Sequence, residues 1–226
     1  FSSGAVVSTF YDPMLAKVIG YGPTRADACA RVARALTECR IHGVYTNRDL
    51  LVGILREPEF QVGAIDTGYL DRHDPAGLMA AATDPAALPI HAAVAALAAQ
   101  ADRRATAEVL AGLPSGFRTL ASAPQRVSFT CGEARVDVSY RFHHGSVRVT
   151  VDGTDLDVVL LSARADLVDA DVDGVRRRYR VTRYGSDVYV DSALGATALR
   201  EVERFPDPSS LTEPGSLVAP MPGAVV

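Results

Sequence analysis

The amino-acid sequence predicts an α+β protein in which a small mixed segment precedes one long helix and an antiparallel β-barrel of eight short strands. Three observations predict this order. Up to about residue 73, apolar β-rich runs alternate with helical patterns. An alanine-rich helical pattern starts at Ile90, and after Arg126 the hydrophobic period changes to two.

The first segment reads as alternating strands and helices. Its strand candidates are short runs rich in β-branched and aromatic residues, at 6–9, 15–21 and 41–45. Thr24 and Asp27 form a capping-box pattern, which predicts the start of a helix. Thr46 and Asp49 repeat the pattern for a second helix, which Pro58 stops.

The second segment combines a helix with many strands. The helix is predicted over 90–113 and ends at Pro114-Ser115-Gly116. The strand candidates centre on 127–129, 136–140, 147–151, 156–161, 165–171, 179–182, 188–190 and 197–202. Asp152-Gly153 and Asp173-Gly174 suit tight hairpin turns. Closing eight strands into a barrel around the helix would remove the sheet edges.

Composition marks the domain boundaries. Ala, Asp, Pro and Gly dominate between Asp71 and Pro89, and Pro and Ser dominate after Phe205. We therefore predict a first domain at 1–73, a linker at 74–89, the helix-plus-barrel domain at 90–204, a linker at 205–215 and the start of another β unit at 216–226.

Charge and composition exclude several function classes. The net charge of −4 is scattered over 226 residues, which argues against a nucleic-acid or anionic-lipid partner. No apolar run approaches the ~20 residues of a membrane span, and no leader pattern is visible, so we expect a cytoplasmic protein without a membrane partner. Three cysteines without CxxC spacing predict neither a disulfide framework nor a zinc site.

Few residues carry recognisable chemistry. Asp12 follows a strand candidate and could reach a neighbouring site, although an Asp before a Pro commonly just starts a turn. Gly20-Tyr21-Gly22 before a helix is a weak phosphate-loop signal. The histidines lack ligand-spaced partners, so we expect no metal site and read His73, His91 and the pair at 143–144 as surface or turn residues.

Longer strings resemble a known family. The string from Val6 through Tyr11-Asp12-Pro13-Met14 to Ile19 is similar to the closing subdomain of biotin carboxylases, and the similarity continues to Asp71. The string Leu217–Gly223 looks like the entry to a biotinyl carrier domain, whose β-sandwich would begin there. Both on one polypeptide resemble the α chain of a biotin-dependent acyl-CoA carboxylase.

The resemblance implies further expectations. The middle region would dock the α chain to carboxyltransferase β subunits, and other α subunits would be further partners. The loop Pro114-Ser115-Gly116-Phe117-Arg118 would be the subunit contact, with Phe117 in place of a more usual tryptophan. Asp12 would lie near the carboxylase site or dimer interface.

The cofactors implied are ATP with Mg²⁺, bound mostly before Phe1, and biotin on a lysine beyond Val226. Lys17 is the only lysine, and it lacks the methionine flanks of a biotinylated lysine. The fragment alone is therefore expected to be inactive.

Alternatives remain open from the sequence. The folds could serve a non-catalytic interaction module, or the chain could belong to a pyruvate or urea carboxylase. The short helix-plus-barrel insert favours acyl-CoA carboxylases of the 3-methylcrotonyl or propionyl type. The identity of the acyl-CoA is not readable, because its pocket would lie on the partner chain.

Overall fold

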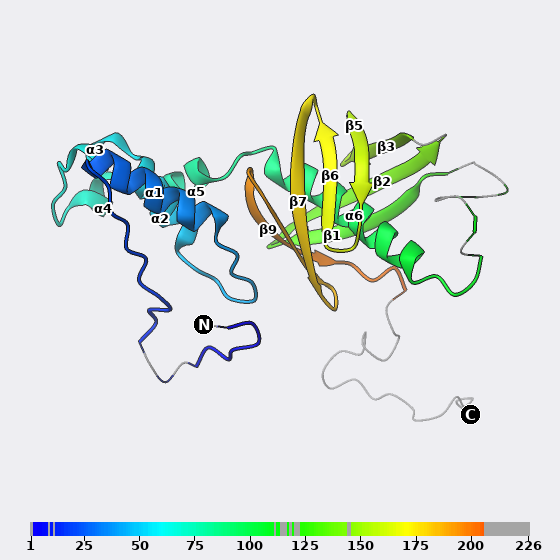
Figure 1. Ribbon diagram of the computed structural model, residues 1–226, viewed down its shortest axis with the longest axis horizontal. Helices are drawn as coiled ribbons and strands as arrows, with labels where there is room; N and C mark the ends of the chain where they lie inside the picture. Colours follow the sequence, from blue (N-terminus) through cyan, green and yellow to red (C-terminus); the bar gives the residue numbers. More distant parts are fainter. Residues whose placement is uncertain are drawn as a thin grey trace, which may run out of the picture. The chain divides into compact units, whose positions relative to one another are not determined.

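A computed structural model describes residues 2–8, 10, 12–110, 112–113, 117, 119, 123–143 and 146–205 of the chain. The chain divides into two compact units, Phe1–Pro85 with Ala193–Gly195 and Ala86–Ser192 with Ala196–Val226. We call them the helical unit and the sheet unit (Figure 1).

The helical unit is built from five short helices. They are α1 (Arg25–Glu38), α2 (Arg48–Arg56), α3 (Pro58–Val62), α4 (Tyr69–Arg72) and α5 (Pro75–Ala82). The capping box predicted for α1 is confirmed, because Thr24 Oγ1 accepts from the Asp27 amide at 3.1 Å and Asp27 Oδ2 accepts from the Thr24 amide at 3.2 Å. Cys29, Ala33 and Leu36 form its buried stripe.

The predicted strands of this unit do not form. No described residue before Gln125 belongs to a strand, so the described residues of the runs at 6–9, 15–21 and 41–45 form irregular segments, and this part of the prediction is wrong. A strand needs a neighbouring strand to pair its N–H and C=O groups, and no two of these runs form a ladder. Residues 74–89, predicted as a linker, contain α5 and the first residues of the sixth helix.

The helices α2 and α5 approach each other closely at Gly53. A Cβ added at Gly53 would lie 2.1 Å from the carbonyl oxygen of Leu78. We expect Gly53→Ala to lower the free energy of unfolding of the helical unit by roughly 1–3 kcal/mol, because a backbone atom cannot yield without separating the helices. Urea unfolding followed by far-ultraviolet circular dichroism measures this change.

Gly77→Ala is the matched control for this prediction. A Cβ at Gly77 would meet only the Asp74 carboxylate, at 3.4 Å, and alanine favours a helix over glycine by about 1 kcal/mol. Stability should therefore stay constant or rise. Equal losses in the two variants would contradict the close approach at Gly53.

The sheet unit contains a nine-stranded antiparallel sheet. Its strands are β1 (Gln125–Cys131), β2 (Ala134–His143), β3 (Ser146–Val151), β4 (Thr154–Leu156), β5 (Val158–Ala163), β6 (Leu167–Val172), β7 (Val175–Tyr184), β8 (Asp187–Ser192) and β9 (Gly195–Glu201). The spatial order is β4-β3-β2-β1-β9-β8-β7-β6-β5. The hairpin turns are as predicted, with positive φ at Asp152, Gly153, Asp173 and Gly174.

The sheet is open, which corrects the predicted eight-stranded barrel. The apolar run at 156–161 is split at Asp157 into β4, which pairs with β3, and β5, which pairs with β6. The amide of Asp157 donates to Asp173 Oδ1 at 3.3 Å, and its carbonyl accepts from the Asp173 amide at 2.9 Å. The chain therefore changes its partner strand at Asp157, and no ladder joins β4 to β5 among the described residues.

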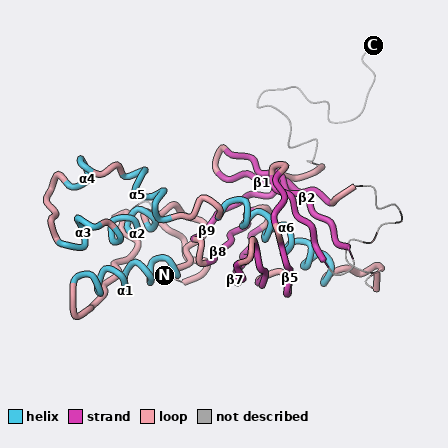
Figure 2. The backbone as a smooth tube through the Cα atoms, turned by 90° about the horizontal axis from the view of Figure 1, so that it is seen from above, coloured by secondary structure: helices cyan, strands magenta, loops and turns pink. Residues whose placement is uncertain are grey.

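The core of the sheet unit is the helix α6 (Ala87–Ala105). Its central residues are buried, and Ala92, Ala95 and Ala96 are 0% exposed. The helix contacts both halves of the sheet, namely β2 and β3 on one side of the strand order and β5 to β8 on the other. Figure 1 shows the sheet curving around α6, and Figures 1 and 2 show the helix crossing the strands at an angle. Small side chains allow strands to approach the helix from several directions.

The helix α6 is shorter than predicted. It begins before Ile90 and ends at Ala105, because Thr106 caps it by donating both its amide, at 3.0 Å, and its hydroxyl, at 2.9 Å, to the carbonyl of Asp102. In the described part of the chain, no single helix is long and apolar enough to cross a membrane, although α5 and α6 taken as a bent pair would be by length and composition.

Candidate functional site

Asp12 lies in a turn at the surface of the helical unit. The amide of Met14 donates to Asp12 Oδ1 at 2.9 Å, so the carboxylate closes the turn over Pro13. This is the role that an Asp before a Pro commonly has. A role near a carboxylase site stays a prediction.

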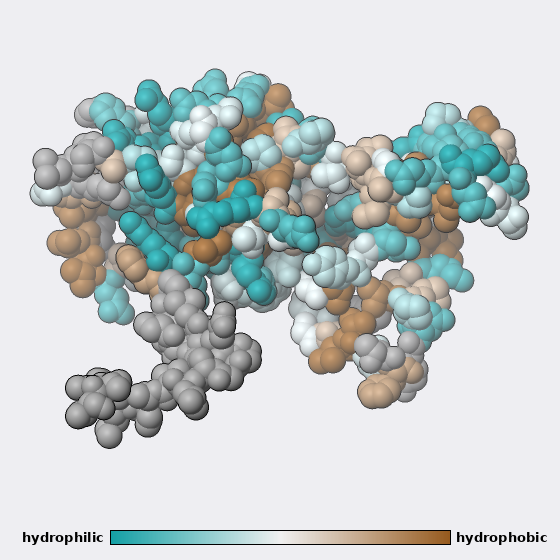
Figure 3. Space-filling model, turned by 180° about the vertical axis from the view of Figure 1, so that it is seen from behind, coloured by the Kyte–Doolittle hydropathy of each residue, from teal (hydrophilic) through white to brown (hydrophobic). Residues whose placement is uncertain are grey.

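Asp12 also borders an apolar groove of about 1050 Å³ on the helical unit. The groove is lined by the segment at 12–18, by α1 and α2, and by the connections that flank them. Met14 and Val18 remain 61% and 48% exposed there. Figure 3 shows such apolar side chains interrupting the hydrophilic surface. A groove of this size is a candidate docking surface.

The Gly20-Tyr21-Gly22 segment packs closely against α1. A Cβ at Gly20 would lie 2.3 Å from Val32 Cγ2, and one at Gly22 would lie 2.5 Å from the amide of Ala28. The first turn of α1 is already capped by Thr24 and carries the acidic Asp27. The glycines are therefore explained by close approach, and the phosphate-loop reading is not supported.

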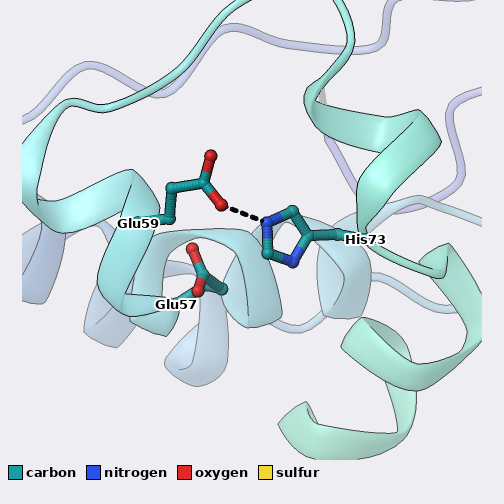
Figure 4. Close-up of side chains that lie close together, drawn as sticks. All are labelled: Glu57, Glu59 and His73. Carbon is teal, nitrogen blue, oxygen red and sulfur yellow. Dashed lines mark hydrogen bonds and ion pairs between the residues drawn. The ribbon is translucent and has the colours of Figure 1, made fainter.

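A carboxylate–histidine cluster joins α3 to α4. Glu59 Oε2 lies 2.7 Å from His73 Nε2 (Figure 4). Glu59 Oε1 accepts from Arg72 at 2.7 Å. Arg72 also donates to Asp66 at 2.8 Å. Glu57 caps α3 by accepting from the Phe60 amide at 2.9 Å. His73 is half-buried and paired, so the expectation of a simple surface histidine was incomplete.

Electrostatics keep the carboxylates of this cluster ionised. Hydrogen bonds from Arg72 and then His73 hold the pKa of Glu59 below its ordinary value. Burial acts to raise the pKa of Glu57, but the backbone hydrogen bonds from Phe60 and Glu59, the charge of His73 and the hydrogen bond from the Tyr69 hydroxyl together lower it.

Glu57, Glu59 and His73 each offer a ligand atom within 4.8 Å of the others. However, both Glu59 oxygens already have protein donors, and the Arg72 guanidinium would repel a cation. The cluster therefore works as a connection between helices, and its spacing of fourteen residues from Glu59 to His73 gives no local sequence signal.

The position of His91 differs most from the one predicted from the sequence. It is 0% exposed on α6, where a surface or turn position was expected. Its Nδ1 lies 2.7 Å from Thr197 Oγ1 and its Nε2 lies 2.8 Å from Ser192 Oγ. Burial lowers the pKa of His91 to about 4, so the ring is neutral at pH 7. Two hydroxyls satisfy both ring nitrogens, which makes this a structural histidine.

The predicted docking loop lies mostly outside the described residues, since Pro114, Ser115, Gly116 and Arg118 are not described. Phe117 is described and is 56% exposed. The same holds for 216–226, the predicted start of a carrier domain. Both stay predictions.

Comparison with known proteins identifies the families that the two parts of the chain match. The family model "Biotin carboxylase C-terminal domain" matches residues 1–72, and "Methylcrotonyl-CoA carboxylase, alpha-subunit, BT domain" matches residues 75–204. Together they define a part of a biotin-dependent carboxylase α subunit. The chain belongs to the methylcrotonyl-CoA carboxylase alpha-subunit BT domain family, and a biotin carboxylase C-terminal domain precedes that domain. The resemblance seen in the sequence is thereby confirmed.

Curated relatives agree over part of the chain. Biotin carboxylase of Halalkalibacterium halodurans is 40% identical over 72 residues, which is 32% of this chain and 16% of that protein. Human mitochondrial pyruvate carboxylase is 40% identical over 70 residues, 31% of this chain and 6% of that protein. Biotin carboxylase 1 of Bacillus subtilis is 39% identical over 74 residues, 33% of this chain and 16% of that protein. The chain spans less than a fifth of each.

No site for biotin or ATP is shown among the described residues. Lys17 stands between Ala16 and Val18 rather than between methionines, so it does not fit a biotin attachment site. The glycines before α1 pack closely against that helix. We assign no cofactor contact to this part of the chain.

Proposed function

We propose that this chain is the part of a biotin-dependent acyl-CoA carboxylase α subunit that completes the biotin carboxylase domain and docks it to carboxyltransferase β subunits. The observation that carries the proposal is the BT-domain match over residues 75–204, which include α6 and the nine strands of the sheet. The whole enzyme would be a cytoplasmic ligase that carboxylates biotin with ATP, Mg²⁺ and bicarbonate, and then transfers the carboxyl group to an acyl-CoA.

The helical unit supports the first half of this role. Its apolar groove leaves side chains such as Met14 and Val18 exposed, and covering them by the remainder of a carboxylase domain would remove apolar surface from water. Asp12, at the border of the groove, would then lie near the carboxylase site or the interface with another α subunit.

The sheet unit supports the second half. The sheet curved around α6 gives a rigid support for the 106–124 connection, which would present Phe117 and Arg118 to the β subunit. An aromatic residue and an arginine on one exposed loop are typical interface anchors. Beyond 205, the chain would lead to a biotin carrier domain starting at 216–226, with biotin on a lysine beyond Val226.

The BT-domain match supports an acyl-CoA carboxylase over the other candidate assemblies. The pyruvate carboxylases match over about a third of the chain, whereas the BT domain of an acyl-CoA carboxylase matches residues 75–204. We therefore favour an acyl-CoA substrate, of the 3-methylcrotonyl or propionyl type, over pyruvate or urea.

The test is assembly with the β subunit. We expect the intact α subunit, mixed with the carboxyltransferase subunit encoded beside it, to form a large complex in size-exclusion chromatography with light scattering. Phe117→Ala/Arg118→Ala should abolish that complex, because truncation of central anchors costs ~2 kcal/mol or more each.

Arg204→Ala/Phe205→Ala is the matched control, since it removes another exposed arginine–aromatic pair of the same unit, with Arg204 over the Phe205 ring at 5.6 Å. It should leave assembly intact. A complex that survives the Phe117/Arg118 change would show that the loop is not the anchor. Failure of the wild-type α subunit to assemble would overturn the acyl-CoA carboxylase proposal.

A further inference from the structure

Two large apolar side chains are exposed where the chain leaves α6. Val109 is 77% exposed and Leu110 is 72% exposed, near the start of the 106–124 connection. A single exposed apolar side chain is ordinary on a protein surface, whereas two adjacent large ones at one loop indicate a contact surface. We call Val109 and Leu110 the apolar pair.

The backbone of Leu110 adopts a conformation that its side chain disfavours. Its φ is 57°, in the left-handed region, where the Cβ atom of an L residue crowds the following carbonyl oxygen. Among the described non-glycine residues, only Asp152 and Asp173 also have a positive φ. Each of these opens an Asp-Gly turn, and its carboxylate accepts an amide hydrogen bond, from Asp137 at 2.7 Å and from Asp157 at 3.3 Å. A leucine side chain has no polar group, so the strain at Leu110 is not offset in this way.

Hydrogen bonds to the end of α6 hold Leu110 in this conformation. The amide of Leu113 donates to the carbonyl of Leu110 at 3.0 Å. Arg104, in the last turn of α6, donates from its guanidinium group to the carbonyl of Leu113. A strained backbone persists only where its surroundings fix it, and here the helix end fixes it.

The same hydrogen bonds leave the apolar pair exposed to water rather than packed in the core. Leu113, held by Arg104, is half-buried, whereas Val109 and Leu110 remain largely exposed. Neither the strain nor the apolar exposure stabilises the free protein. A partner that covered the pair would remove apolar surface from water and would gain from the fixed backbone, because the ordering has already taken place.

We propose that the apolar pair is a second anchor for the carboxyltransferase β subunit and inserts into an apolar pocket there, an inference that rests on the function proposed above. Two observations favour this partner. The pair belongs to the connection that carries the exposed Phe117, and it follows the core helix of the region that the BT-domain model matches. Because Val109 and Leu110 carry no charge, the complementary surface is apolar rather than charged.

The test measures the affinity of the full-length α subunit for the β subunit by biolayer interferometry. We expect Val109→Ser/Leu110→Asn to weaken binding roughly ten- to a hundredfold, because a buried apolar anchor is removed. The ratio to wild type should not depend on NaCl, since salt screens charges and not apolar contacts. The urea midpoint of the variant should be no lower than that of wild type, because asparagine tolerates a positive φ better than leucine does.

Val159→Ser/Leu161→Asn is the matched control. It makes the same two chemical changes on β5, where the side chains are 59% and 46% exposed, and it should bind like wild type. Val109→Ile/Leu110→Met keeps the pair apolar and of similar size, so it should retain most of the affinity.

The possible failures can be told apart. Wild-type affinity in Val109→Ser/Leu110→Asn would overturn the anchor while leaving the proposed function intact, whereas absence of binding by the wild-type α subunit would overturn both. A lower urea midpoint together with the weaker binding would assign the pair to folding rather than docking. If light scattering showed that the variant loses self-association of the α subunit and keeps its affinity for the β subunit, the choice of partner would be wrong.

Discussion

Lowering the pH from about 7 to about 4.5 is expected to remove up to about 3 kcal/mol of the stability of the sheet unit through His91 alone. The ring is 0% exposed, and both nitrogens contact hydroxyl groups at 2.7 and 2.8 Å. Burial lowers its pKa to about 4 from an ordinary value of 6.5. Protonation would place a charge on the buried face of α6, in the core of the sheet unit.

The sign of the effect follows from these two pKa values. Between about pH 6.5 and 4 the unfolded chain binds the proton and the folded chain does not, so stability rises with pH in this window. The contribution is complete above the unfolded pKa and is lost as the pH falls toward the folded pKa. Carboxylates such as Asp187, whose pKa is lowered first by the hydrogen bond from Arg200, act at lower pH.

Urea unfolding followed by tyrosine fluorescence at a series of pH values measures this dependence. His91→Gln should be less stable at pH 7, because an amide cannot reproduce both contacts, but its stability should change little between about pH 6.5 and 4.5. His143→Gln, at an exposed position of β2, should keep the wild-type dependence. An unchanged pH dependence in His91→Gln would refute the assignment.

Leu97→Ala should lower the free energy of unfolding of the sheet unit by about 2–5 kcal/mol. Leu97 is 1% exposed at the centre of α6 and is among the largest fully buried side chains. Alanine is the best helix former, so the loss reports packing against the sheet rather than helix propensity. The surrounding strands cannot collapse into the cavity without breaking their ladders.

Leu161→Ala makes the same chemical change on β5, where the side chain is 46% exposed. We expect it to cost less than about 1 kcal/mol. The two variants are compared by urea unfolding at pH 7. Similar losses at Leu97 and Leu161 would mean that α6 is not the packing centre of the sheet.

Pattern and resemblance recovered most of the architecture. The Thr24–Asp27 capping box, the alanine-rich helix and the Asp-Gly turns depend on neighbouring residues, and each is present. Local interactions fix such features, so they can be read from a short window. The family resemblance rested on long strings, and the two family matches confirm it.

The incorrect strand predictions concern features that depend on contacts between residues far apart in the sequence. The apolar runs before Gln125 have the residue pattern of strands, but their described residues do not pair with another strand. One apolar run was split at Asp157 because its two halves pair with different strands. The candidate residues Asp12 and Phe117 are placed at exposed positions, and their functional roles await the experiments above.

The sequence by itself determined that this protein joins a biotin carboxylase end to a helix with an antiparallel sheet, because periodicity, turns and motifs are local. Only the tertiary structure decided that His91 is a neutral core residue and that Glu59 connects Arg72 with His73. These depend on helix packing and strand register, which bring together residues far apart in the chain. Burial and charge neighbours then set the chemistry of each side chain.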